Sequence, residues 1–225
     1  MAIDPVKQPP AARLRTPRSA AAAGIVFAVL LGVSMVIVQS TIPAGDRQDP
    51  SWLSGETWSL SVAVTLVPFA GIAFLWFMGV VRDQIGDAED RFFATVFLGS
   101  GLLMLASLFV WIGLIGAALA TTSASPDWPN SDTFPFVASL IDIMGSTIAL
   151  RMAGVFVFAT STIWMRTGVM PKWVGLASAA TGVALLIGGG QIRHLRFLFP
   201  LWVLFVSILI LVAVRKRRDS AGADA

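Results

Sequence analysis

The sequence predicts an all-α integral membrane protein, a bundle of six transmembrane helices with both termini in the cytoplasm. The 225 residues are 56% hydrophobic and only 13% charged, against about 25% charged residues in a typical soluble domain. The mean hydropathy is +0.79, and the apolar residues fall into runs close to the roughly 20 residues that a helix needs to cross the hydrocarbon. We therefore expect lipid to be the solvent of this chain, with the six helices forming one domain over residues 20–216.

The first apolar run covers residues 20–41, and Arg13, Arg15 and Arg18 precede it. A basic segment before an apolar run is also typical of a cleaved signal peptide. The apolar run is longer than that of a signal peptide, and "TIPAGDR" after it is a poor cleavage site. We expect an uncleaved first helix that follows a disordered, basic cytoplasmic tail over residues 1–19.

The other five runs differ in length. The third and fourth are long enough to tilt or to protrude, whereas the fifth and sixth have about 18 residues. Three consecutive glycines, Gly188 to Gly190, are expected to end the fifth helix. Small residues four apart predict close helix packing on the fourth run at Gly145, Ala149 and Ala153, and on the fifth at Ala177 and Thr181. The runs cover residues 59–81, 92–119, 138–165, 173–190 and 197–214, and residues 217–225 are expected to form a second cytoplasmic tail.

The distribution of Lys and Arg predicts the orientation, because cytoplasmic loops carry an excess of both. Only Arg47, Arg193 and Arg196 fall on the side that would then be external, and Arg151 lies inside the fourth run. The other twelve basic residues fall on alternate segments, which we expect in the cytoplasm: Lys7, Arg13, Arg15, Arg18, Arg82, Arg91, Arg166, Lys172, Arg215, Lys216, Arg217 and Arg218.

Residues 74–109 carry a distinctive block, "FLWFMGVVRDQIGDAEDRFFATVFLGSGLLMLASLF". This block resembles one found in an uncharacterised family of bacterial multi-pass membrane proteins. The resemblance rests on WF-x-G-V-x-R-D followed by E-D-R-F-F-A-T-V-F-L-G-S-G. It implies a multi-pass protein of the bacterial cytoplasmic membrane. It implies no chemistry, and no functional residue is carried over from it.

Composition argues against several kinds of site. The chain has no Cys, which excludes disulfides and thiolate metal sites. His194 is the only histidine, so one chain cannot supply a multi-histidine metal cluster. We expect no metal, no cofactor and no catalytic residue. Ser100 in "GSG" is typical of intramembrane serine proteases, but His194 falls at the opposite end of the helices from it. The basic residues flank membrane helices, which explains them better than nucleic-acid binding does.

Two charged residues lie inside the apolar fourth run. Asp142 and Arg151 are nine residues apart, which on a straight helix is about 13–14 Å of rise and about 180° of rotation, so they cannot pair. Arg193, His194 and Arg196 are expected on the same side of the membrane as Asp142 and would be its partners. Arg151 either reaches the membrane surface as a structural residue or lines a functional site, and we expect it not to face bulk lipid. These five residues are the candidate binding residues.

Two functions are favoured from the sequence, and a third, an intramembrane enzyme, is disfavoured because no nucleophile or metal cluster can be assembled at one depth. The first is a non-enzymatic membrane protein that binds a membrane-protein partner or a second copy of itself, or that serves as an accessory subunit. The alternative is a small transporter or channel with a polar site around Asp142 and Arg151. A polar cavity that reaches Arg151 would favour transport, whereas a filled interior with small residues exposed on one helix would favour partner binding.

Overall fold

The computed structural model describes residues 17–42, 49–55, 57–85 and 91–223, and for a few of these, Arg193 among them, it describes only the backbone. Every regular element in these ranges is helical. The long elements are α1 (Pro17–Thr41), α3 (Trp58–Ile85), α4 (Arg91–Ala124), α6 (Ala149–Thr167), α7 (Lys172–Gly188) and α8 (Leu198–Ala223). The short ones are α2 (Ser51–Ser54), η2 (Trp128–Asn130), α5 (Phe134–Asp142), η3 (Ile143–Ile148) and η4 (Arg193–Phe197).

Within the described ranges, five helical stretches are long and apolar enough to cross a membrane, so the chain is a multi-pass membrane protein by length and composition. The fourth stretch is one continuous helix made of α5, η3 and α6. The predicted fifth crossing, α7, is apolar but has only 17 residues, or about 25 Å of helix against about 30 Å of hydrocarbon. The five stretches are Ser19–Thr41, Trp58–Arg82, Phe92–Ala124, Phe134–Thr167 and His194–Ala213.

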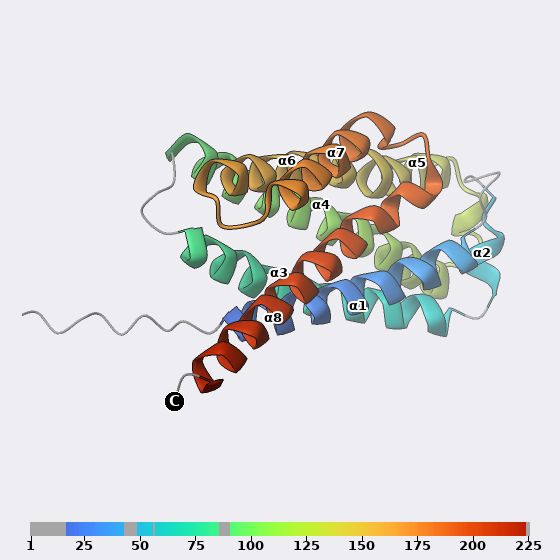
Figure 1. Cartoon of the computed structure of the whole chain (residues 1–225). Coiled ribbons are helices and arrows are strands. Elements are labelled where there is room, and N and C mark those ends of the chain that lie inside the picture. The colour runs from blue at the N-terminus through green and yellow to red at the C-terminus, as the bar shows by residue number, and fades with distance from the viewer. Residues whose placement is uncertain (1–16, 43–48, 56, 86–90, 224–225) are drawn as a thin grey trace, which may run out of the picture.

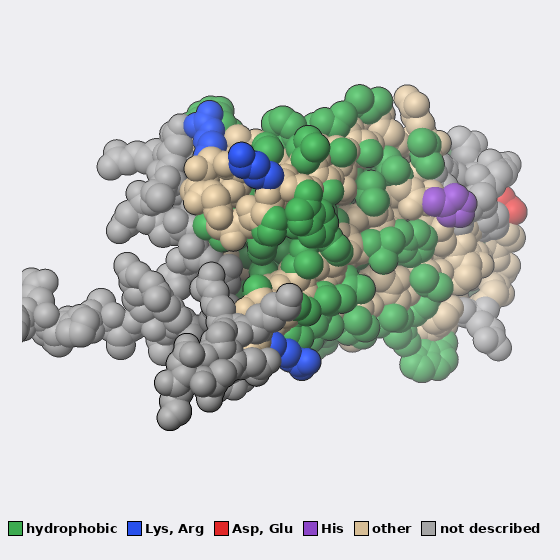
Figure 2. Space-filling model, viewed as in Figure 1, with side chains coloured by type: hydrophobic (Ala, Val, Ile, Leu, Met, Phe, Trp, Pro, Cys, Tyr) green, Lys and Arg blue, Asp and Glu red, His purple; other side chains and the backbone are tan. Residues whose placement is uncertain are grey.

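The helices run alternately up and down the bundle (Figure 1). We call the end that holds the start of α1, the end of α8 and the α6–α7 turn the tail end. The opposite end holds α2, η2 and the start of α5, and we call it the ion-pair end. Helix α1 packs on α3 and α8, α4 packs on α3 and α6, and α7 packs mainly on α6. Figure 2 shows Lys and Arg side chains at the tail end, His and acidic side chains at the other, and hydrophobic side chains between them.

The predicted runs agree with the helices to within a few residues, except at the two tails. Helix α1 already begins at Pro17, so residues 17–19 are helical, and residues 1–16 lie outside the described part of the chain. Helix α8 continues to Ala223, well past the predicted start of the second tail at residue 217. Arg, Lys and Ala are good helix formers, so the helix continues beyond its apolar part.

An aromatic cluster, defined as Phe27, Phe74, Phe97, Phe156, Phe199 and Trp202, occupies the interior of the bundle. Its rings come from α1, α3, α4, α6 and α8. The ring of Phe156 lies 4.8 Å from Phe97 and 5.3 Å from Phe74, and Phe74 lies 4.8 Å from Phe27. All six side chains are buried, four of them completely. Five of the long helices therefore meet in one set of packed rings.

Helices α6 and α7 approach each other at two glycines. A Cβ on Gly182 would lie 2.9 Å from the backbone nitrogen of Phe158 and 3.0 Å from the carbonyl oxygen of Gly154. The predicted packing face on the fourth run is confirmed, because Gly145, Ala149 and Ala153 are buried. On α7 the prediction was wrong. Ala177 is exposed, and the buried face carries Ser178, Gly182 and Leu185, because only a glycine permits the backbone contact with α6.

This contact predicts a destabilising effect of Gly182→Ala. The added methyl group meets backbone atoms that cannot move independently, so we expect the variant to lose about 1–3 kcal/mol of stability and to unfold at a lower temperature in detergent. Gly79 of α3 provides the control, because a Cβ there meets nothing within 4 Å and alanine is the better helix former. Gly79→Ala should leave the unfolding temperature unchanged or raise it. Equal unfolding temperatures for Gly182→Ala and Gly79→Ala would show that the α6–α7 contact is not tight.

Candidate functional site

An ion pair joins two helical segments that are far apart in the sequence. The Nη2 atom of Arg196, in η4, donates to Oδ1 of Asp142, the last residue of α5, at 3.2 Å. The side chains are only 14% and 19% exposed, respectively. The expectation that Asp142 lies beside the 193–196 cluster is confirmed for Arg196. The pair holds η4, which leads into α8, against the first third of the fourth long helix.

The π-helical segment η3 follows Asp142 directly and covers Ile143 to Ile148. A π-helical turn takes up one residue more than an α-helical turn. Asp142 and Arg151 are therefore separated by roughly 80° of rotation rather than the roughly 180° of a straight helix. The straight-helix assumption was wrong for this reason. Gly145, inside η3, faces the indole of Trp111 in α4. A Cβ on Gly145 would lie 2.5 Å from the Nε1 atom of Trp111.

The ion pair is recessed within the bundle. Asp142 comes eight residues after Phe134, where α5 begins, which is about 12 Å along the helix. It meets Arg196 there because α7 is short. This helix ends at Gly188, as predicted, and Gly190 with φ of +92° turns the chain towards η4. In Figure 1 this turn falls short of the end of the bundle that α2 reaches.

Arg151 does not join this pair. Its side chain is exposed, and among the described residues it makes no hydrogen bond or ion pair. The structure places Arg151 on the outer surface of the bundle, and the expectation that it does not face bulk lipid stays a prediction. The glycines at the end of α7 leave room on the neighbouring surface, and the Cγ of Arg151 lies 3.6 Å from where a Cβ on Gly189 would be. The aliphatic stem of Arg151 thus lies beside the end of α7, and its guanidinium can extend to the membrane surface.

The other predicted site residues contribute less. His194 lies in η4 with its side chain exposed, and the side chain of Arg193 falls outside the described part of the chain. Within the described residues, no group of three or more His, Cys, Asp or Glu side chains could hold a metal ion. Ser100 is buried in α4 and donates to the carbonyl oxygen of Val96 at 2.6 Å. Of the five candidates, the structure brings together Asp142 and Arg196.

One polar contact between helices was missed in the sequence. The Nε1 atom of Trp202, in α8, donates to Oγ of Ser178, in α7, at 2.9 Å, and both side chains are buried. The signal was present, since an indole N–H inside an apolar run needs an acceptor. The acceptor could not be chosen, because many Ser and Thr residues in this chain instead donate to carbonyls of their own helix.

Comparison of the chain with family models, with curated proteins and with solved structures gives no match. The resemblance of residues 74–109 to a bacterial family therefore stays a prediction. Function has to be inferred from the geometry of this chain alone.

Two arginines in this region are predicted to respond differently to the same substitution. Arg196→Leu removes the guanidinium beside a partly buried carboxylate, so we expect a loss of about 1–3 kcal/mol and a lower unfolding temperature in detergent. Arg151→Leu removes an exposed charge from an apolar surface and should leave expression and unfolding temperature unchanged or raised. The double variant Asp142→Leu/Arg196→Leu should recover part of the first loss. An Arg151→Leu variant as unstable as Arg196→Leu would contradict these assignments.

Proposed function

We propose that this protein is a non-enzymatic membrane protein that acts by binding another membrane protein within the bilayer. The observation that carries the proposal is the aromatic cluster. Its rings occupy the interior where all the long helices except α7 meet, and Trp202 ties α7 to them through Ser178. A substrate that entered beside Asp142 and Arg196 would have to displace these buried rings to reach the tail end. A filled interior leaves the outer faces of the helices as the surfaces available for function.

Helix α4 offers a face suited to a second helix. Gly113, Ala117 and Thr121 are spaced four residues apart and are all exposed. A Cβ on Gly113 would meet nothing within 4 Å, whereas one on Gly116, on another side of the same helix, would lie 3.2 Å from Val64. One side of α4 is thus packed inside the bundle while the other presents small side chains. Small residues let the backbones of two membrane helices approach closely, which is how such helices gain packing energy in lipid.

Photo-cross-linking in intact cells tests this proposal. A photoreactive residue in place of Ala117 should give a discrete protein adduct, either with another membrane protein or with a second copy of this chain. The matched control is the same residue in place of Ile72 on α3, which is 55% exposed. The control should give only diffuse labelling by lipid. A Gly113→Leu substitution should reduce the Ala117 adduct by blocking close approach. Equal labelling at Ala117 and Ile72, without a discrete band, would contradict the proposal.

A small transporter is the second candidate. It is supported by the recessed ion pair and by η3, because π-helical turns often occur at functional sites. Transport through the bundle would require the aromatic cluster to separate, and Arg151 would contribute from the exposed surface rather than from a cavity. Partner binding requires neither change, so it remains the better-supported function.

We further propose that the protein lies in a bacterial cytoplasmic membrane with six crossings and both termini in the cytoplasm. The positive-inside rule supports this orientation, since Lys and Arg side chains gather at the tail end (Figure 2). The direction of α7, which leads from the tail end back towards the ion-pair end (Figure 1), supports counting it as a crossing and so supports a total of six. Its length of about 25 Å can be accommodated by local thinning of the bilayer.

Single-cysteine labelling tests the topology directly, because the chain has no native Cys. A cysteine in place of Ser125, between α4 and η2, should react with a membrane-impermeant reagent from outside the cell. A cysteine in place of Gly168, in the α6–α7 turn, should react only after the cells are opened. A cysteine in place of Gln191, after α7, should behave like Ser125→Cys if α7 crosses. Labelling of the Gln191 site together with the Gly168 site would contradict six crossings.

A further inference from the structure

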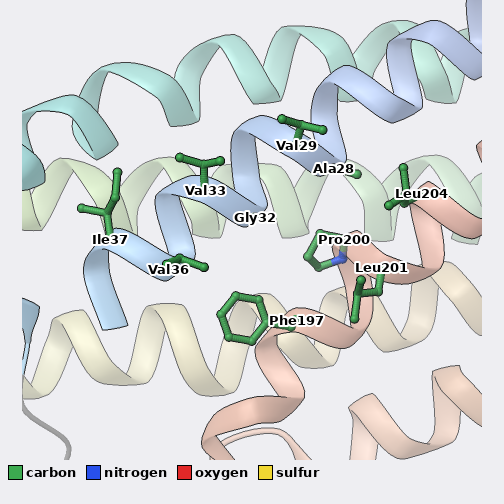
Figure 3. A pocket seen from close by; sticks show the side chains of 10 residues that line it. All are labelled: Ala28, Val29, Gly32, Val33, Val36, Ile37, Phe197, Pro200, Leu201 and Leu204. Atoms are coloured by element: carbon green, nitrogen blue, oxygen red, sulfur yellow. The ribbon is translucent and has the colours of Figure 1, made fainter. Parts of the chain in front are cut away.

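An apolar groove lies between α1 and the segment that leads from the end of η4 into α8. Its volume is about 410 Å³. Figure 3 shows the lining side chains, which come from both helices, with the ring of Phe197 on the side of its helix that is nearer to α1. Its lining contains no polar side chain: Ala28, Val29, Gly32, Val33, Val36, Ile37, Phe197, Pro200, Leu201 and Leu204.

The groove is closed at one end and open at the other. Towards the tail end α1 and α8 are in close contact, because Gly24 has no side chain and the Ser207 hydroxyl and the Phe77 ring occupy that space. Towards the ion-pair end the two helices diverge, and a Cβ on Gly32 would meet nothing within 4 Å. Pro200, near the start of α8, lines the groove there (Figure 3).

The position of the groove limits what can fill it. All its lining residues lie within the membrane-spanning stretches Ser19–Thr41 and His194–Ala213. An apolar cavity does not hold water, because a bound water needs polar partners. Its rim faces lipid, since Val33 is 46%, Val36 56% and Leu201 58% exposed. Only hydrocarbon or another apolar membrane segment can occupy it.

Size separates these two occupants. A helix about 10 Å wide, lying along the nine-residue rise from Ala28 to Ile37, would fill roughly 1,000 Å³, more than twice the volume of the groove. A single hydrocarbon chain is much thinner. A cavity of about 150 Å³ accepts benzene, so 410 Å³ holds on the order of 16 carbon atoms by the same ratio.

We propose that this groove binds one acyl chain of a membrane phospholipid. The chain enters from the leaflet at the ion-pair end, beside Ile37 and Phe197, and its methyl end points towards the contact between Gly24 and Ser207. This site does not depend on the partner-binding function proposed above, because it uses a different face of the bundle.

Photolabelling with a lipid probe tests the site. The full-length protein is reconstituted in phosphatidylcholine vesicles that contain a small fraction of phosphatidylcholine with a diazirine on one acyl chain. After illumination, the labelled positions are mapped by mass spectrometry. We expect residues 28–37 and 197–204 to be labelled several-fold more than the equally lipid-exposed positions Ile72 and Leu75 of α3. Even labelling of all exposed helix faces in the unmodified protein would overturn the proposal without any variant.

A matched pair of glycine variants completes the test. Gly32→Leu fills the groove from its floor and should lower labelling of residues 197–204 several-fold. Gly79→Leu adds the same side chain where a Cβ also meets nothing within 4 Å, outside the groove, and should leave that labelling unchanged. The comparison requires that Gly32→Leu and Gly79→Leu unfold at the same temperature, so that a difference in labelling does not reflect a difference in folding. Labelling that persists in Gly32→Leu, or that falls equally in both variants, would overturn the proposal.

Discussion

The packed rings of Phe74 and Phe156 are the contact on which the arrangement of the other helices depends. Helices that are already in lipid have no hydrophobic driving force to associate. Their association therefore rests on dispersion contacts and on the few polar contacts between helices. Phe74 touches rings of α1, α6 and α8, and Phe156 touches rings of α3, α4 and α8. Every long helix except α7 thus contributes to one set of contacts, and α7 is attached to it through the bond from Trp202 to Ser178.

The short length of α7 accounts for several features at the ion-pair end. Because α7 ends at Gly188, the chain turns before it reaches the level of α2, and η4 meets the fourth long helix at Asp142 rather than at its start. The same turn brings Gly189 under the side chain of Arg151. It also places the start of α8 beside the second half of α1, where the two helices diverge and leave the groove. The recessed ion pair, the exposed arginine and the apolar groove therefore share one cause.

The two arginines near Asp142 illustrate how burial decides the role of a charge in a membrane protein. Arg196 is 14% exposed and is held by a carboxylate, so its charge is balanced inside the structure. Arg151 is exposed and lies near the end of α7, so water and headgroups within reach of its long side chain can solvate it. A filled interior, with the recessed ion pair of Asp142 and Arg196 at one end, suits a protein that acts through its outer faces better than one that moves a polar substrate through its centre.

Much of this architecture was predictable from the sequence. The length and apolarity of the runs predicted where the membrane helices lie, including the short α7, because the bilayer demands about 20 apolar residues for each crossing. The sixth run was expected to be as short as the fifth, whereas α8 is longer. The placement of Lys and Arg predicted which segments share an end of the bundle, and the three consecutive glycines predicted the end of α7. The sequence position of Asp142 also indicated that its partner would come from residues 193–196. All of these follow from local composition and from the thickness of the membrane.

The tertiary structure decided the features that depend on which face each helix turns inward and on how far apart the helices lie. The π-helical turn at η3 changes the rotation between Asp142 and Arg151, and no composition signal in Ile143 to Ile148 predicts one extra residue in a turn. The backbone contact between Gly154 and Gly182 selects the packed face of α7, one residue along from the face expected at Ala177 and Thr181. The groove arises from the angle between α1 and α8, which Gly24 permits and Ser207 limits. A single sequence contains the residues that make these contacts, but only their meeting in three dimensions selects the pairs.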